Sequence, residues 1–276
     1  MQGHLDLLAV RSENGATVLR RQSFAPPLHI SKPHHDAGWL VVNLASPTPG
    51  LFAGDRIEAR VEVESGARLL ITAPSANRIH TMSAGHAELN QTFRVATGGV
   101  LDVWPEYLLP QKDSRYRQRT RLDVEPGGAL LWTESVAPGR TARGEAFAFA
   151  ELRLATDVFL GTTHLVRERY ALTPGSRAVA ALQRKFPEAY YASVISVAAD
   201  AKAEEFDFSA IQALQNAGET WVGATRLGAS AIATKIVAAN SPALRHALAC
   251  VRDTLFRWLK LPPASLRRVT GAPVLL

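Results

Sequence analysis

Three short stretches decide the fold, because each repeats the same order of strand, glycine turn and strand. The copies recur at intervals of about 30 residues, a period typical of stacked repeats. They read VEVESGARLL at 61–70, VATGGVL at 95–101 and VEPGGALL at 124–131. Glycine supplies the positive φ that such corners need, and no unit could bury its apolar face alone, so the repeat predicts pleated layers stacked along an axis. A plain sandwich of two long Greek-key halves would produce much the same pattern.

Strand patterns continue outside the repeat. Residues 5–10 and 17–19 flank the turn Glu13-Asn14-Gly15, whose Asn-Gly pair is typical of a tight hairpin. Residues 56–64 alternate apolar and charged side chains, as a half-buried strand does. We therefore expect a mainly β fold, a two-layered, solenoid-like stack of strands in which residues 1–200 are mostly strand.

The last part of the chain, residues 201–276, combines strands with helices. We expect a short helix over 210–217 with Ser209 as its N-cap, and two strands over 220–227 and 231–237. A longer helix near 241–260 has Ser241 as its expected N-cap and Pro242 as its first residue. Its apolar residues recur at steps of four and three, which predicts one face packed on the body of the protein: Leu244, Leu248, Val251, Leu255 and Trp258.

Length and composition limit the class of protein. A chain of 276 residues is one large domain or two small ones, and we expect a single domain over 1–276. Cys250 is the only cysteine, which excludes an internal disulfide and is typical of a reducing cytoplasm. The net charge of +6 favours acidic partners without requiring nucleic acid. No uncharged stretch is apolar and long enough for a membrane-spanning helix, so we expect a cytoplasmic protein that contacts neither membrane nor nucleic acid.

Motifs of common enzyme classes are absent from the sequence. It contains no dinucleotide fingerprint, no phosphate loop, no His-Glu-x-x-His and no Gly-x-Ser-x-Gly. We therefore expect a protein that is not an enzyme and has no tightly bound cofactor. The alternative is a β-rich hydrolase or lyase in which Glu106 and Glu145 form an acid–base pair.

Histidines and arginines give two weaker signals. His34, His35 and His80 are candidates for weak contacts with a metal in transit, although adjacent residues on a strand point to opposite faces. Four arginines alternate with other residues, so a strand would place their guanidinium groups on one face: Arg115, Arg117, Arg119 and Arg121. This face is either an ordinary solvated surface or a docking surface for carboxylates of a partner.

Carboxylates inside a β fold form a third signal. Asp55 follows a glycine turn, and Arg140 and Glu145 belong to a glycine-punctuated segment in which they could form an ion pair. Charged residues are seldom buried without a partner or a purpose. Four carboxylates could therefore line a polar passage: Asp55, Glu106, Glu134 and Glu145.

Several segments together resemble the family of the urease accessory protein UreD, also called UreH. They follow one another in the family's order along most of the chain. These segments are residues 3–7, 14–19, 27–33, PGLFAGD at 49–55, LITAPSANRIH at 70–80, LDVWPEYLLP at 101–110, Tyr116-Arg-Gln118 and Gly139-Arg140 to Gly144-Glu145. One departure is Thr72-Ala73, where the family commonly has two threonines.

The resemblance implies a non-catalytic scaffold with a two-layered β fold and a helical C-terminal portion. It implies that the protein docks on urease apoprotein together with UreF-like and UreG-like partners and offers nickel a passage to the enzyme. Positions that match the family's segments are the expected lining or interface residues: Asp55, Thr72, Glu106, Arg140 and Glu145. Sites for a metal in transit should bind weakly, because a tight cage would retain its cargo.

Overall fold

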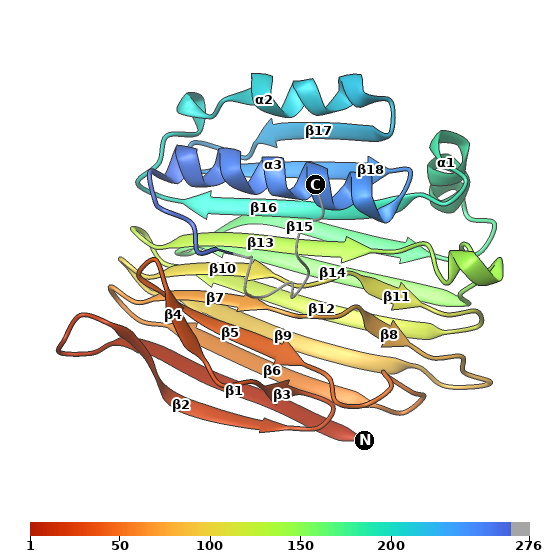
Figure 1. The fold of residues 1–276 in the computed structure, drawn as a ribbon, viewed down its shortest axis with the longest axis horizontal. Helices are drawn as coiled ribbons and strands as arrows, with labels where there is room; N and C mark the ends of the chain where they lie inside the picture. Colours follow the sequence, from red (N-terminus) through yellow and green to blue (C-terminus); the bar gives the residue numbers. More distant parts are fainter. Residues whose placement is uncertain (266–276) are drawn as a thin grey trace.

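Two β-sheets face each other in this computed structural model, which describes residues 1–265 (Figure 1). The seven-stranded sheet contains, in spatial order, β15 (Thr163–Leu172), β14 (Glu151–Leu160), β12 (Arg115–Val124), β9 (Ala87–Val95), β6 (Arg56–Val63), β1 (Gln2–Arg11) and β2 (Thr17–Ala25). The eleven-stranded sheet follows the order β17 (Thr220–Arg226), β18 (Ala231–Ala238), β16 (Tyr190–Ala198), β13 (Ala129–Val136), β10 (Val100–Trp104), β7 (Arg68–Thr72), β5 (Trp39–Ala45) and β3 (His29–Ile30). Its remaining strands are β4 (His34–Asp36), β8 (Asn77–Ile79) and β11 (Leu108–Pro110).

The three repeats form successive layers of a β-solenoid. In each, the first strand lies in the seven-stranded sheet and the second in the eleven-stranded sheet, as β6–β7, β9–β10 and β12–β13. Equivalent strands of neighbouring layers pair in parallel, so each layer repeats the path of the one before it. The predicted two-layered stack is thus confirmed, and the Greek-key sandwich is not what forms. The hairpin predicted around Asn14-Gly15 is also present, as the antiparallel pair β1–β2.

Glycines make the corners between the two sheets. Gly66, Gly98 and Gly127 have φ of +73°, +74° and +83° and stack on one another through backbone hydrogen bonds, from Gly66 N–H to Gly98 O (3.1 Å) and from Gly98 N–H to Gly127 O (2.9 Å). In two of the corners a second glycine follows, Gly99 or Gly128. Glycine is required there for a different reason, because a Cβ would lie 2.9 Å from a backbone oxygen of the preceding layer. The corners therefore set how closely layers can stack.

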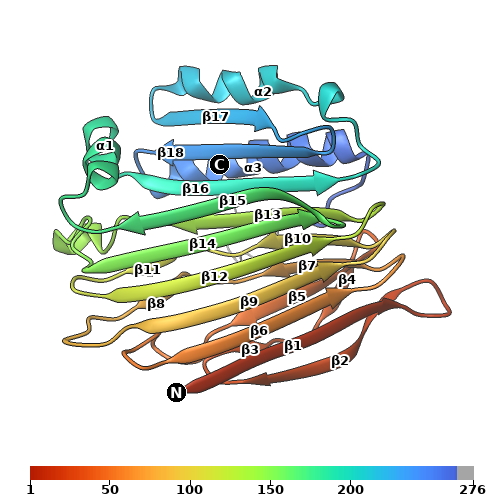
Figure 2. The same cartoon turned by 180° about the vertical axis from the view of Figure 1, so that it is seen from behind.

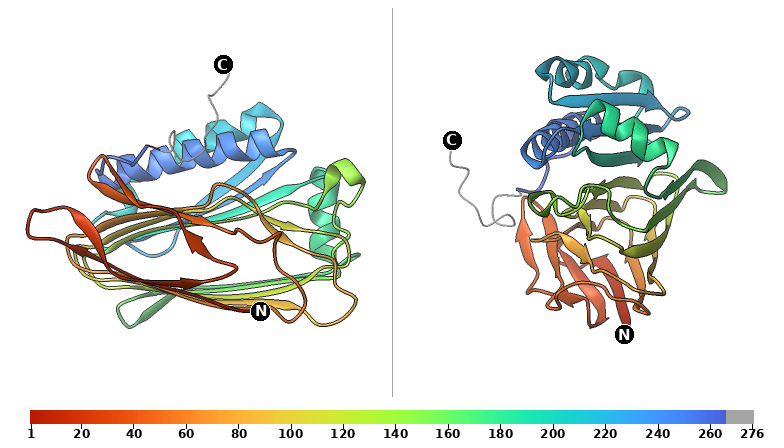
Figure 3. Two further views of the ribbon diagram at one scale, coloured as in Figure 1. Left: turned by 60° about the horizontal axis from the view of Figure 1, so that its bottom comes forward. Right: turned by 90° about the vertical axis from the view of Figure 1, so that its right-hand side faces the viewer.

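The apolar core fills the space between the sheets. Strand β6 alternates as predicted, with Ile57, Val61 and Val63 buried. Val61 and Val63 share one core cluster with Leu69, Leu101 and Leu130 of the opposite sheet, each of which is fully buried and aligned across three strands. Figure 3 (left) shows these two layers stacked, with α3 (Ser241–Leu259) on the outer side of the eleven-stranded sheet.

Helices cover one outer face only. The apolar stripe predicted for the long helix is buried at all five positions, against the outer side of the eleven-stranded sheet. The same helix places Arg252 against Asp102 of β10 in a buried ion pair of 2.6 Å. None of the helices within residues 1–265 has the length and apolar character to cross a membrane. Figure 2 shows that the seven-stranded sheet carries no helix on its outer face.

Helix boundaries differ slightly from the sequence predictions. Asn240, not Ser241, caps α3, because its Oδ1 accepts the N–H of Ala243 at 2.9 Å. Asp207, not Ser209, caps the shorter helix α2 (Phe208–Gln212) through the N–H of Ser209. The remaining elements are α1 (Arg177–Lys185) and three 3-10 turns, η1 (Thr141–Arg143), η2 (Ala203–Glu205) and η3 (Ala213–Ala217).

The corner geometry predicts a difference between two Gly→Ala variants. In Gly128→Ala the new Cβ would press on backbone oxygens of the neighbouring layer, so we expect urea unfolding to show a loss of about 2 kcal/mol in the free energy of unfolding. Gly223 in β17 has open space around it and no positive φ, so Gly223→Ala is the matched control and should leave stability unchanged or slightly raised. Equal losses in both variants would contradict this explanation.

Candidate functional site

A row of polar side chains crosses the inner face of the seven-stranded sheet. Parallel register brings Gln91 of β9 beside Thr120 of β12, and Thr120 beside Thr156 of β14; Thr156 then faces Glu168 on the antiparallel strand β15. Thr120 and Thr156 are almost fully buried. The row exists because stacked layers place the same position of each strand at the same depth.

A second polar row crosses the inner face of the eleven-stranded sheet. Glu134 of β13 lies beside Ser193 of β16, which lies beside Lys235 of β18. Lys235 Nζ donates to Ser193 Oγ at 2.6 Å and also binds Glu168 Oε1 of the other sheet, while Ser193 Oγ donates to Glu168 Oε2 at 3.1 Å. These contacts join the two rows across the interior.

Glu134 is the central carboxylate of this polar interior. Its side chain accepts a hydrogen bond from Gln118 Nε2 of β12, and Gln118 Oε1 in turn accepts one from Tyr116 Oη at 2.9 Å. Burial raises the pKa of Glu134 to about 7, and the negative charge of Glu168 adds to the rise, against the opposing effects of Gln118 and Lys235. A carboxyl group of this kind exchanges its proton near neutral pH.

A cavity of about 150 Å³ opens beside Glu134 between the sheets. Its walls are mostly apolar, from residues such as Phe93, Ile71 and Trp132, with Gln118 and Gln91 contributing amides. It extends from Glu134 to Ser75, an exposed residue, and so reaches the surface. The space is large enough for several water molecules, whose hydrogen-bond partners would be the few polar groups of its wall.

Comparison with known proteins identifies the family. A family model described as UreD urease accessory protein matches residues 1–270. The chain belongs to the UreD family. A urease accessory protein UreD of Opitutus terrae is 39% identical over 92% of this chain and 93% of its own length. Those of Deinococcus radiodurans and Haloarcula marismortui are 33% and 30% identical, over 87% and 82% of this chain and 85% and 76% of their own.

In this UreD chain, two of the five residues expected to line a passage or an interface lie at the cavity. Thr72, at the end of β7, is buried, and Glu106 follows β10. Glu106 Oε2 accepts a hydrogen bond from Arg245 of α3 at 3.0 Å. Thr72, Glu106 and Glu134 therefore belong to the wall of one cavity.

The other three residues hold turns. Asp55 accepts the N–H of Phe52 at 2.8 Å and pairs with the amino group of Met1 at 2.7 Å. Arg140 binds both carboxylate oxygens of Glu145, at 2.6 and 2.7 Å, which lowers the pKa of Glu145. None of the three belongs to the cavity wall. Glu106 and Glu145 are thus bound by different arginines.

The arginines of β12 lie on one face, as their alternation predicts, and that face is the outer one. Their side chains point away from the buried residues of the strand. Carboxylates bind three of them, namely Glu151 with Arg117, Glu88 with Arg119 and Asp123 with Arg121. Arg115 instead donates to the carbonyl oxygen of Met82 at 3.0 Å.

The three candidate histidines, His34, His35 and His80, are not part of a group of metal ligands in the described part of the chain. His35 Nε2 contacts the carbonyl oxygen of Thr17 at 2.8 Å, and His80 stacks on Phe52 with ring centroids 4.4 Å apart. His34 is the neighbour of His35 on β4. Within residues 1–265, no group of three or more His, Cys, Asp or Glu side chains is placed to hold a metal ion.

Sequence reasoning named Glu134 but missed its neighbours. A signal was present in β13, where the inward positions Leu130, Trp132 and Val136 are apolar and Glu134 interrupts them. Glu168 and Lys235 gave no such signal, because the alternation of buried and exposed residues is less regular in their strands. The two residues also lie 67 positions apart in the chain, so their contact could not be expected from local sequence.

The raised pKa of Glu134 predicts a specific pH dependence of stability. Because the pKa of Glu134 in the folded protein, about 7, lies above the ordinary value of 4.5, the folded state binds this proton more tightly than the unfolded state does. Protonated Glu134 therefore contributes to stability at low pH, and this contribution is lost as pH rises from about 4.5 through 7. Glu134→Gln should abolish this loss, so that its free energy of unfolding exceeds that of wild type by roughly 3 kcal/mol more at pH 8 than at pH 5. Urea unfolding across this range measures it, with Glu58→Gln on the outer face as control. Parallel pH profiles for wild type and Glu134→Gln would refute the assignment.

Proposed function

We propose that this protein is a non-catalytic accessory factor that docks on urease apoprotein with UreF-like and UreG-like partners and assists the delivery of nickel. Family membership supports the role in urease maturation. The observation that carries the finer proposal is the cavity that reaches from the surface to Glu134 between the two sheets. The single cysteine of the sequence is consistent with action in the cytoplasm.

The polar interior supports a passage because stability alone would favour apolar residues there. Glu134 is 5% exposed, and burying a carboxylate costs free energy unless it is paired. Oxygen ligands from a carboxylate, an amide and a hydroxyl group can contact a divalent cation without enclosing it. At the cavity wall, Glu134 supplies a carboxylate oxygen and Gln118 an amide oxygen, and Thr72 belongs to the same wall.

Weak binding fits delivery better than storage. Few ligands converge at any one point of the cavity, so a nickel ion would keep most of its water and leave easily. A cation that reaches Glu134 would compete with the proton that this group exchanges near neutral pH. The ammonium group of Lys235, which pairs with Glu168, would repel a cation, so we propose that the path ends before this pair.

The hydrolase alternative gains no support from the geometry. Glu145 is held by Arg140 on a loop, whereas Glu106 belongs to the cavity wall and is bound by Arg245. An acid–base pair needs two carboxyl groups that converge on one substrate. We therefore retain the accessory role as the proposed function.

A plugged cavity should impair urease maturation without preventing assembly. In cells that co-express urease with its own accessory proteins, Ala76→Leu at the cavity wall and Glu134→Ala inside it should lower nickel per urease active site, measured by elemental analysis, about fivefold or more. Affinity purification of the complex should recover partners in wild-type amounts. Gly223→Ala is the control, since it changes an exposed position far from the cavity wall. Normal nickel content in both cavity variants would overturn the proposed passage.

A further inference from the structure

The outer face of the seven-stranded sheet contains a hollow walled by arginines. Its volume is about 310 Å³, and its floor is formed where Ala155 of β14 and Ala171 of β15 lie among long side chains. Cross-strand pairing places Arg119 and Arg169 on either side of Ala155, and Arg117 and Arg153 in the next row. The hollow exists because two alanines occupy positions that arginines surround.

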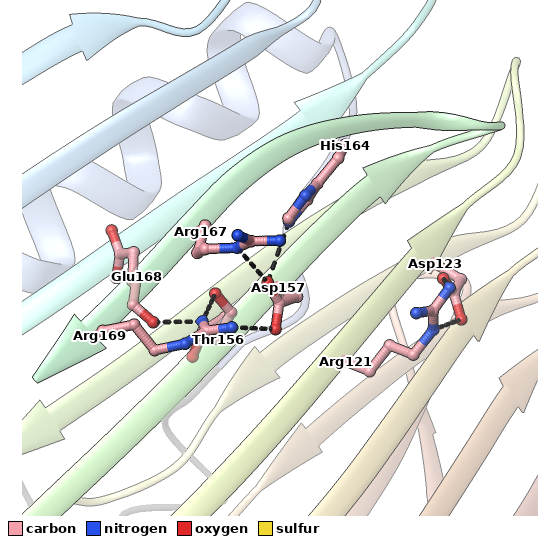
Figure 4. A network of polar contacts seen from close by, with 8 residues as sticks. All are labelled: Arg121, Asp123, Thr156, Asp157, His164, Arg167, Glu168 and Arg169. Carbon is pink, nitrogen blue, oxygen red and sulfur yellow. Dashed lines mark hydrogen bonds and ion pairs between the residues drawn. The ribbon is translucent and has the colours of Figure 1, made fainter.

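Carboxylates outside the hollow fix these arginines in place. Glu151 binds Arg117 at 2.9 Å and Arg153 at 2.8 Å, while Asp157 binds Arg169 at 2.6 Å and Arg167 at 3.5 Å. Figure 4 shows the part of this network around Asp157, with Arg167, Arg169 and His164 as its donors. Although burial works in the opposite direction, hydrogen bonds from these partners hold the pKa of Glu151 and of Asp157 below its usual value.

The hollow retains unused binding capacity. Arg119 pairs with Glu88 at 3.5 Å. Together with the pairs of Glu151 and Asp157, this makes three carboxylates for five arginines, so positive charge is in excess: Arg117, Arg119, Arg153, Arg167 and Arg169. A guanidinium group has five N–H donors. Arg169 Nη1 also donates to the carbonyl oxygens of Thr156 and Glu168, at 3.2 and 2.6 Å, so in Arg169 the capacity left is at Nε and at one N–H of Nη2. The four arginines of the wall are 43–75% exposed, so these donors are accessible from solvent.

The chemistry of the face favours a protein carboxylate over other anions. Carboxylates such as Glu62, Glu88 and Asp123 are interspersed among the arginines and would repel a continuous phosphate backbone or an anionic membrane. The aromatic residue at the hollow, Tyr170, contacts Tyr191 Oη through its hydroxyl group and offers no free platform for a base. A folded partner can instead place one carboxylate in the hollow and direct its own cations to the surrounding acids.

The geometry points to this hollow as a docking socket for an acidic segment of a partner protein, one that carries two or more clustered Asp or Glu side chains. An inserted carboxylate would receive paired N–H donors from Arg119 and Arg169, which already flank the floor. The socket refines the expectation for the β12 arginines: Arg117 and Arg119 belong to it, and Arg153 and Arg169 of neighbouring strands complete it. The inference rests on the proposed docking role but not on nickel transit.

A fluorescein-labelled octaglutamate peptide tests the socket on the full chain by fluorescence anisotropy at low salt. Ala155→Leu fills the hollow without changing charge and should weaken binding about fivefold or more. Arg119→Ala with Arg169→Ala should weaken it by roughly tenfold, since each exposed ion pair contributes up to about fivefold. Arg56→Ala with Arg60→Ala removes the same charge from this sheet outside the hollow and is the matched control, expected within twofold of wild type. Circular dichroism confirms that each variant folds.

Two results would overturn the socket. Binding of octaglutamate that is unaffected by Ala155→Leu would show diffuse attraction to the basic face rather than insertion into the hollow. Tighter binding of a labelled RNA oligonucleotide, weakened by Ala155→Leu, would assign the hollow to nucleic acid instead. Because neither urease nor nickel is present in this assay, a negative result leaves the proposed passage standing, and normal urease maturation in the cavity variants leaves the socket standing.

Discussion

Stacking of the glycine corners is the constraint on which the rest of this structure depends. Backbone hydrogen bonds from Gly66 to Gly98 and from Gly98 to Gly127 hold successive layers in the same register. The main-chain groups of these glycines are thereby paired with one another rather than with solvent. A side chain at Gly99 or Gly128 would push the layers apart, because each approaches backbone oxygens of the layer before it.

Fixed register explains why polar residues line up inside the protein. Gln91, Thr120 and Thr156 come from three layers, yet they form one row because their strands pair in parallel without a shift. Opposite them, antiparallel pairing aligns Glu134 with Ser193 and Lys235. Such rows can be satisfied internally only when both sheets present them at the same depth, as the contacts of Glu168 with Lys235 and Ser193 demonstrate.

The sequence predicts the structural features that depend on residues close together in the chain. It does not predict the features that depend on which distant strands pair. Glycine spacing predicted the layers, and the apolar stripe of α3 predicted its buried face at all five positions. Its cap was misplaced by one residue, because Asn240 and Ser241 are both good caps and only the backbone geometry distinguishes them. The polar rows and the alanine-floored hollow arise from the order in which β12, β14 and β15 pair, which local patterns do not specify.

One strand serves both surfaces of the sheet, and this limits how they can change. Along β12, Gln118 faces Glu134 in the interior while Arg117 and Arg119 face the hollow outside. Side chains on opposite faces of a strand make no contact with each other, so substitutions can alter the outer face while the interior is retained. A shift of register by one residue would instead exchange the two sets, burying arginines beside the cavity. The glycine corners prevent that shift, and in doing so they keep the polar interior and the basic face on their separate sides.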